Sequence, residues 1–140
     1  MIDDRLWKVI QKKLGYNDDE LEIFKNNPRN ELVLSKSSEL LSIRFEVEII
    51  ESNGCNSKHK KGDKIYLDGY GNLIKDQNPD KLCIFTLGPL QTLIFAAQEL
   101  VYAGIDPNEM KFNIVGCGDV GVKCGGWGKV VMKICAKKVN

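Results

Sequence analysis

The sequence predicts an α+β protein in which a small, largely antiparallel sheet packs on one central helix, preceded by a helical N-terminal segment. Three observations predict this class: helical periodicity near the N-terminus, alternation of apolar and polar residues in several later segments, and one long apolar helix pattern between those segments. A helix placed between strands in the chain can cover one face of such a sheet. We therefore expect residues 1–41 to form the N-terminal segment and residues 42–140 to form the core domain.

Residues 3–36 have the periodicity of short helices. Leu6, Ile10 and Leu14 recur on one helical face. The residues around them include a glycine stop, a capping-box pair and a proline suited to the first turn of a helix. These signals are, in chain order, Gly15, the pair Asn17 and Glu20, and Pro28. Three short helices are therefore expected before the core domain begins.

Alternating apolar and polar residues predict the strands of the core domain. In residues 43–49 the apolar positions alternate with charged ones, which gives a strand with one buried face and one wet face. Residues 64–74 predict a strand, a glycine-containing turn and a second short strand. Residues 110–114 and 130–134 alternate again, on either side of a glycine-rich connection. The core domain therefore has two or three strands before its helix and two after it.

The strongest helix is predicted over residues 89–103, beginning at Pro89 and ending before Gly104. It belongs to the longest apolar region of the chain, residues 82–105. Polar residues and a Gly-Pro pair interrupt that region, whereas a membrane span needs roughly 18 apolar residues in a row. We therefore expect a central core helix and no membrane partner.

Composition limits the class of function. The chain has 20 Lys and Arg residues against 19 Asp and Glu, a formal net charge of +1. Proteins dedicated to nucleic acid usually carry a strong basic excess, so no nucleic-acid partner is expected. The N-terminus lacks the basic start and apolar run of a signal peptide. We expect a soluble, cytoplasmic protein.

The connection between the last two strands contains the pattern G-x-G-x-x-G at residues 116–121. That pattern marks a dinucleotide site only where it opens a helix within a βαβ unit. Gly125, Gly126 and Gly128 follow, and glycine at this density disfavours a helix. We therefore interpret the glycines as giving the backbone freedom to fold back, so that residues of the connection can converge on one centre.

Five cysteines, an odd number without a secretory signal, favour metal binding or thiol chemistry over a disulfide framework. Cys55 and His59 form C-x3-H in one loop, Cys117 and Cys124 lie in the glycine-rich connection, and Cys83 precedes the core helix. Thiolates and imidazole suit zinc, and thiolates suit an iron–sulfur cluster. We expect three or four of these five side chains to form a metal site.

Two other interpretations of the same residues stay open. Free cysteine often packs as a small hydrophobe, and we expect that role for Cys135, which lies in an apolar strand pattern. Cys83 suits either role. Alternatively, Cys55 is a reactive nucleophile beside basic residues, with His59 and either Asp63 or Asp119 completing a catalytic set.

Residues 43–135 resemble a family of small uncharacterised proteins found mainly in anaerobic bacteria and archaea. The shared pattern is a strand, a cysteine followed by a histidine and Gly-Asp, a strand, a cysteine, an apolar helix and a late cysteine. The matching positions here are Cys55, His59, Gly62, Asp63, Cys83 and Cys117. The chain departs from the short members in its helical N-terminal segment and in the longer loop that carries Cys124. The resemblance implies an anaerobic setting and a common role for the matching cysteines and histidine.

The function expected from these patterns is binding of zinc or an iron–sulfur cluster by an accessory subunit or domain of an anaerobic enzyme system, with a protein partner or a homo-oligomer. One alternative is a small enzyme that uses a metal-bound water or a reactive cysteine. Another is a protein-interaction module, for which the N-terminal helices and Trp127, flanked by glycines, would supply the contact surface.

Overall fold

The computed structural model describes residues 2–139, and the chain divides into two compact units, residues 1–38 and 39–140. The first unit contains three helices, and a short fourth helix crosses the boundary between the units. Their bounds are α1 (Asp4–Leu14), α2 (Asp18–Lys25), α3 (Pro28–Ser35) and α4 (Ser37–Leu41).

The start and stop signals of the first unit act as the sequence predicts. Gly15 ends α1 in the left-handed conformation, with φ of 74°. The Asn17 side chain accepts a hydrogen bond from the Glu20 N–H at 2.9 Å, and the Glu20 carboxylate accepts one from the Asn17 N–H at 2.8 Å. Pro28 begins α3. These capping interactions fix the helix ends before any tertiary packing is considered.

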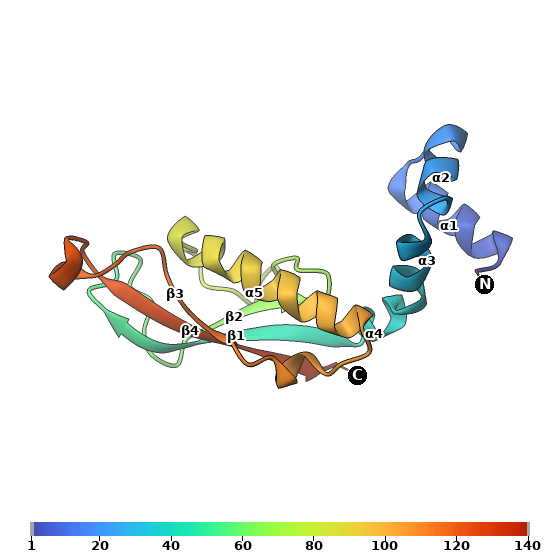
Figure 1. Ribbon diagram of the computed structural model, residues 1–140. Coiled ribbons are helices and arrows are strands. Elements are labelled where there is room, and N and C mark those ends of the chain that lie inside the picture. Colours follow the sequence, from blue (N-terminus) through green and yellow to red (C-terminus); the bar gives the residue numbers. More distant parts are fainter. Residues whose placement is uncertain (1, 140) are drawn as a thin grey trace. The chain divides into compact units, whose positions relative to one another are not determined.

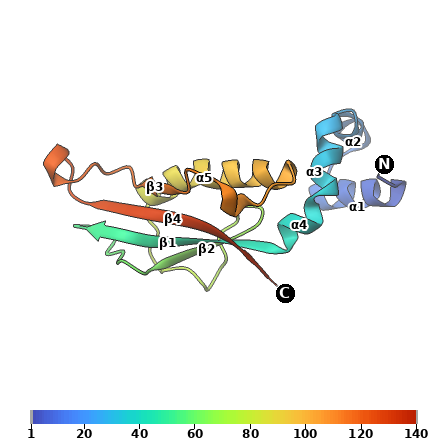
Figure 2. The same ribbon diagram turned by 60° about the horizontal axis from the view of Figure 1, so that its bottom comes forward.

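The second unit is a four-stranded antiparallel sheet with the long helix α5 along one face, which Figures 1 and 2 show. The strand order is β2-β1-β4-β3. The element bounds are β1 (Ile43–Asn53), β2 (Lys64–Asp68), α5 (Ile84–Tyr102), the 3-10 turn η1 (Pro107–Glu109), β3 (Ile114–Gly116), the 3-10 turn η2 (Val122–Cys124) and β4 (Lys129–Lys138). The predicted α+β class, with a helical segment before the sheet and a central helix, is confirmed.

Alternation in β1 and β4 builds the core. Three apolar residues of β1 are completely buried, and three of β4 are at most 5% exposed. These residues are Phe45, Val47 and Ile49 in β1 and Val130, Met132 and Ile134 in β4. They pack beneath Leu90, Leu93, Ile94 and Ala97 of α5 in one cluster. The hydrophobic effect of this burial is therefore shared between the two central strands and the helix.

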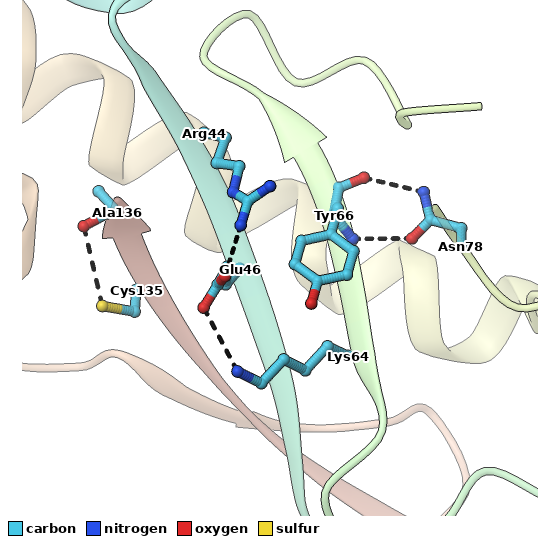
Figure 3. A network of polar contacts seen from close by, with 7 residues as sticks. All are labelled: Arg44, Glu46, Lys64, Tyr66, Asn78, Cys135 and Ala136. Atoms are coloured by element: carbon cyan, nitrogen blue, oxygen red, sulfur yellow. Dashed lines mark hydrogen bonds and ion pairs between the residues drawn. The ribbon is translucent and has the colours of Figure 1, made fainter. Parts of the chain in front are cut away.

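The opposite face of the sheet is polar (Figure 3). Glu46 pairs with Arg44 at 3.1 Å and with Lys64 at 3.6 Å, and the Arg44 guanidinium lies over the Tyr66 ring at 4.9 Å. Cys135 lies opposite Glu46 in the register, on this face, and is half-buried. The expectation that Cys135 packs in the core is wrong, because its strand neighbours Ile134 and Ala136 alternate onto the other face.

Two strand boundaries differ from the sequence prediction. β1 continues to Asn53, because Ser52 and Asn53 pair with Val130 and Lys129 after a bulge between Ile49 and Glu51. β3 is shorter than predicted: residues 110–113 lie outside it, and only Ile114–Gly116 pair with β4. The alternating pattern indicates residues that suit a strand. Hydrogen bonding to a neighbouring strand then determines where each strand begins and ends.

Helix α5 begins at Ile84, five residues before the predicted start at Pro89. A proline inside a helix has no N–H for the carbonyl four residues earlier, which here belongs to Phe85. The Phe85 carbonyl instead accepts a hydrogen bond from the Gly118 N–H at 2.8 Å. The helix therefore passes through Pro89 because another segment satisfies the carbonyl that proline leaves free.

Within the described residues 2–139, α5 is long and apolar enough, by length and composition alone, to cross a membrane: it has 19 residues and a mean hydropathy of 1.3. The core helix of a soluble protein passes the same test. Here six residues of α5 are buried in the domain. The expectations of a cytoplasmic location and of no membrane partner stay predictions.

We expect Phe45→Ala to lower the free energy of unfolding of the core domain by about 3–5 kcal/mol, because it removes a fully buried aromatic side chain from the centre of the sheet. The matched control is Phe112→Ala, at a side chain that is 75% exposed, which should change stability by no more than about 0.5 kcal/mol. Urea unfolding followed by circular dichroism measures both. Equal losses would contradict the assigned core.

Candidate functional site: a cysteine-lined cavity

Three of the five cysteines line one cavity of about 460 Å³. Cys55 comes from the loop after β1, Cys83 from the residue before α5, and Cys117 from the residue after β3. All three are half-buried. Cavities of roughly 300–1,000 Å³ hold small ligands and cofactors in other proteins. The topology therefore gathers three thiols that are far apart in the sequence.

Cys83 stands at the N-cap position of α5. Its backbone is extended, with φ of −81° and ψ of 132°, and its carbonyl accepts hydrogen bonds from the N–H groups of Thr86 and Leu87, both at 3.0 Å. Its side chain makes no capping hydrogen bond. The backbone thus begins the helix without using the thiol, which is left to line the cavity.

Cys117 is held between β4 and α5 by its backbone. Its N–H donates to the Val130 carbonyl at 2.8 Å, and the next residue, Gly118, donates to the Phe85 carbonyl. The Val130 N–H in turn donates to the Cys117 Sγ at 3.3 Å. A cysteine sulfur that accepts a backbone N–H has a fixed direction, so the position of this thiol is set by the sheet.

Cys55 reaches the cavity because the loop after β1 lies close against the glycine-rich connection. Its carbonyl accepts from the Lys58 N–H at 3.1 Å, which closes a tight turn. The preceding residue, Gly54, lies against Gly128, where an added Cβ would collide with the Gly54 carbonyl. Only glycine fits at position 128, so the glycine-rich connection reaches the Cys55 loop backbone to backbone.

Asp119 organises the glycine-rich connection. Its carboxylate accepts hydrogen bonds from the N–H groups of Gly128 at 2.9 Å, Gly121 at 3.0 Å and Trp127 at 3.1 Å. These bonds, those from Gly128 and Gly121 foremost, hold the pKa of the Asp119 carboxyl below its ordinary value. A Cβ at Gly126 would collide with the same carboxylate. Asp119 is therefore an anchor of the loop, which sequence reasoning had considered only as a partner of a catalytic cysteine.

The other predicted site residues lie outside the cavity lining. His59 is buried, 4% exposed, and its Nε2 has no hydrogen-bond partner among the described residues. Cys124 is exposed in η2. Three of the five candidate ligands therefore share the cavity. The catalytic set of Cys55, His59 and Asp119 is not assembled, since the Asp119 carboxylate is bonded within its own loop and His59 does not line the cavity.

The three thiols do not form a ready-made metal site. Across residues 2–139, no three side chains of histidine, cysteine, aspartate or glutamate are grouped closely enough to hold a metal ion. Cys55 and Cys117 also pack against the edge of the hydrophobic core. Binding of a metal at this cavity would thus require the thiols to draw together.

Two aromatic residues also line the cavity: Phe85 from the first turn of α5, and Trp127, 81% exposed, from the glycine-rich connection. The glycine-flanked position of Trp127 had suggested a place over a site, whereas Phe85 was missed. The available signal was a proline within an apolar helical pattern, since Pro89 implies that a carbonyl one turn earlier needs another donor.

Comparison with protein-family models, curated proteins and solved structures found no match to this chain.

We expect Pro89→Ala to loosen the attachment of Gly118 to α5. The new N–H at position 89 competes with Gly118 for the Phe85 carbonyl, so the Gly118 amide should exchange with solvent faster. The control is Gly88→Ala, where an added Cβ meets nothing within 4 Å. It raises helix propensity by about 1 kcal/mol without adding a donor. Hydrogen exchange measured by NMR distinguishes the two; unchanged exchange at Gly118 in Pro89→Ala would refute the attachment.

We expect the glycine-rich connection to lose order in acid. Because the pKa of Asp119 is lowered in the folded protein, the ordering is complete above about pH 4, the ordinary carboxyl range, and is lost as the pH falls through the depressed value. Fluorescence anisotropy of Trp127, in a Trp7→Phe background, should fall accordingly.

Asp119→Asn should lower the Trp127 anisotropy already at neutral pH, because the charge that the three N–H groups stabilise is gone. Asp106→Asn, at the N-cap of η1, is the control and should leave the anisotropy unchanged. If the two variants behave alike, the anchoring role of Asp119 is wrong.

Proposed function

We propose that the protein binds a thiophilic metal, as zinc or as an iron–sulfur cluster, through Cys55, Cys83 and Cys117. The observation that carries this proposal is the shared cavity: three cysteines from three separate segments line it, and the two remaining cysteines do not. Cysteine thiolates are preferred ligands of zinc and of iron–sulfur clusters.

The surroundings of the thiols are consistent with such a group. The backbone N–H that reaches the Cys117 Sγ is the kind of donor that stabilises metal-bound sulfur and tunes cluster potential. Three protein thiolates leave the fourth position of a tetrahedral zinc site for one further ligand. A bound zinc would supply a Lewis acid, and a bound cluster would supply an electron carrier.

His59 is the nitrogen donor that we propose to join the thiols. It follows Cys55 by four residues in the same loop, and its buried Nε2 has no partner among the described residues. A buried imidazole nitrogen without a hydrogen bond is costly, and a metal ion would satisfy it. His59 lies outside the cavity lining, so this proposal requires its side chain to move toward the thiols when the metal binds.

The accessory role belongs to the same proposal. Outside the thiols the cavity is lined mainly by apolar and glycine residues, and the catalytic set of Cys55, His59 and Asp119 is not assembled. A protein that presents a metal without its own acid–base machinery suits a subunit or domain of a larger enzyme system. The anaerobic setting is supported by the resemblance over residues 43–135.

The competing explanation is packing, because Cys55 and Cys117 also contact the core. Packing and metal binding predict different results for cysteine substitutions. A packing role depends on size and polarity, so Cys→Ala and Cys→Ser should change stability. A ligand role depends on the sulfur itself, so either substitution should abolish binding even where the fold is intact.

The test is metal analysis and visible absorbance of protein purified and reconstituted without oxygen. We expect stoichiometric zinc, or iron with sulfide, in the wild type. Cys55→Ser, Cys83→Ser and Cys117→Ser should each weaken binding by at least about 100-fold, since even outer-shell changes cost 10–100-fold. Cys124→Ser and Cys135→Ser are matched controls that should bind as the wild type does.

Two outcomes would overturn the proposal. One is the absence of zinc and iron from folded wild-type protein after anaerobic reconstitution. The other is equal binding by all five cysteine variants, which would show adventitious metal. His59→Gln tests the nitrogen ligand separately: normal binding by that variant removes His59 from the site and leaves the three thiols.

A further inference from the structure

The two edges of the sheet differ in how their backbone is protected. β2 forms one edge and β3 forms the other (Figure 2). At the β2 edge, the Asn78 side chain accepts a hydrogen bond from the Tyr66 N–H at 2.7 Å and donates one to the Tyr66 carbonyl at 2.9 Å. The Asp68 N–H donates to the Asn72 carbonyl at 2.9 Å. The segment that follows β2 therefore covers the outer side of that edge strand.

The outer side of β3 has no such cover. The Asn113 carbonyl and the Cys117 N–H both form hydrogen bonds to β4. Because residues of an antiparallel strand alternate in this respect, Ile114 and Gly116 direct their N–H and C=O groups away from β4, toward the free edge. Within residues 2–139, no hydrogen bond reaches these outward groups.

The β3 edge also lacks the usual protection against strand pairing. Exposed edges are normally blocked by charged residues, proline or a bulge, because their unpaired backbone groups are a template for another strand. Residues 112–118 contain no charged residue and no proline. Phe112 and Ile114 are 75% and 50% exposed. The edge is therefore suited to accept an added strand.

The hairpin that carries this edge is basic. Residues 110–138 contain six lysines and a single acidic residue, Asp119, whose carboxylate is bonded to N–H groups of its own loop. Residues 1–109 instead contain 14 Lys and Arg against 18 Asp and Glu. The nearly balanced charge of the whole chain thus conceals a local excess of positive charge beside β3.

Two of these lysines lie directly beside the free backbone groups. Lys133 is opposite Ile114 in the register of β3 and β4. A Cβ at Gly116 would lie 3.4 Å from the Cε and 4.0 Å from the Nζ of Lys129, so this ammonium group lies over the glycine. Glu48 is opposite Lys133 on the other side of β4, but neither lysine forms an ion pair within residues 2–139. Both ammonium groups are therefore available to a ligand at the edge.

We propose that the β3 edge binds an extended, acidic segment of a partner protein, which adds a fifth strand antiparallel to β3. The backbone of the segment pairs with the outward N–H and C=O groups of Ile114 and Gly116. An apolar side chain of the segment lies beside Ile114, and an acidic side chain crosses Gly116 to the Lys129 ammonium. Side chains on one face of a strand are two residues apart, so the segment needs an apolar and an acidic residue separated by one other.

Charge and backbone chemistry favour this occupant over two others. A second copy pairing through the same edge would bring its own lysines against those of the first, and like charges placed side by side weaken strand pairing. A nucleic acid would suit the lysines, but a phosphate backbone has no N–H donors for the carbonyls of Ile114 and Gly116. An acidic polypeptide supplies both the donors and the negative charge.

This inference goes beyond the metal-binding proposal and does not rest on it. The unpaired backbone groups and the lysines are present whether or not the thiols hold a metal. A negative result at the edge would therefore leave the metal analysis of the cysteine variants unaffected, and a chain without metal would still present the edge.

NMR titration of the full chain with a synthetic peptide tests the proposal. The peptide is acetylated Thr-Val-Thr-Glu-Thr-Val-Thr-Glu, and at low salt we expect saturable shifts of the Ile114 and Gly116 amide resonances. A peptide with lysine in place of both glutamates should bind at least about 10-fold more weakly, because it places like charges beside the edge. A glutamate peptide methylated at the valine and glutamate nitrogens should not bind, because those N–H groups form the ladder.

Substitutions in the chain test the same contact from the other side. Lys129→Glu should weaken binding of the glutamate peptide by at least about fivefold and strengthen binding of the lysine peptide. Lys137→Glu is the matched control, because it makes the same change of charge on β4 opposite Arg44, away from β3. Ile114→Pro should weaken the binding of both peptides, because it removes one outward donor while leaving the hydrogen bonds to β4.

Three outcomes would overturn the proposal. The first is equal affinity for the glutamate and lysine peptides. The second is binding that leaves the amide resonances of Ile114 and Gly116 unshifted. The third is a dimer that forms without peptide and is lost in Ile114→Pro, since this would assign the edge to a second copy of the chain.

Discussion

The hydrogen bond from the Gly118 N–H to the Phe85 carbonyl, 2.8 Å long, is the contact on which the site depends. It exists because Pro89 cannot donate to that carbonyl, so the first turn of α5 has an acceptor available to another segment. Gly118 can use it because the two backbones approach closely; a Cβ at Gly118 would lie 3.2 Å from the Phe85 ring. This bond ties the residue after Cys117 to the turn that begins with Cys83. Backbone hydrogen bonding alone therefore places Cys83 and Cys117 near each other, independently of any ligand.

The remaining parts of the cavity follow from the pairing of β1 with β4. The register carries β1 to Asn53 opposite Lys129, so the loops after β1 and before β4 leave the sheet together. Gly54 and Gly128 then meet at a distance that no side chain would permit. The Asp119 carboxylate accepts hydrogen bonds from three backbone N–H groups of the glycine-rich connection. This loop is too rich in glycine to form a helix, so these N–H groups have no helical partner. Cys55 therefore reaches the cavity because the longest strand pair of the sheet ends there.

The sequence was sufficient for the parts of the fold that depend on local periodicity. Leu6, Ile10 and Leu14 predicted α1, of which only Ile10 is buried. The alternation in residues 43–49 and 130–134 predicted the two central strands, because burial on one face imposes that period. The start of α5 and the shortness of β3 depended on pairing between distant segments, which no local pattern contains. The same limit applies to the site. The glycines predicted that Cys117 and Cys124 turn toward Cys55 and His59, and of these four residues the structure places Cys55 and Cys117 in the cavity lining, whereas Cys124 and His59 lie outside it.

Helix α5 is far more apolar than the rest of the chain, in which positive and negative charges nearly balance. Its inner face, with Leu90, Leu93 and Ala97, supplies one side of the core. Its first turn must offer the Phe85 carbonyl to Gly118, which requires a proline where an ordinary helix would have a donor. A helix that served only the sheet would normally carry lysine or glutamate on its outer face, because charged residues there cost nothing and favour solubility. The absence of charge from Ile84 to Gln98 is explained by neither the core nor the cavity, and the first charged residue on the exposed side of α5 is Glu99.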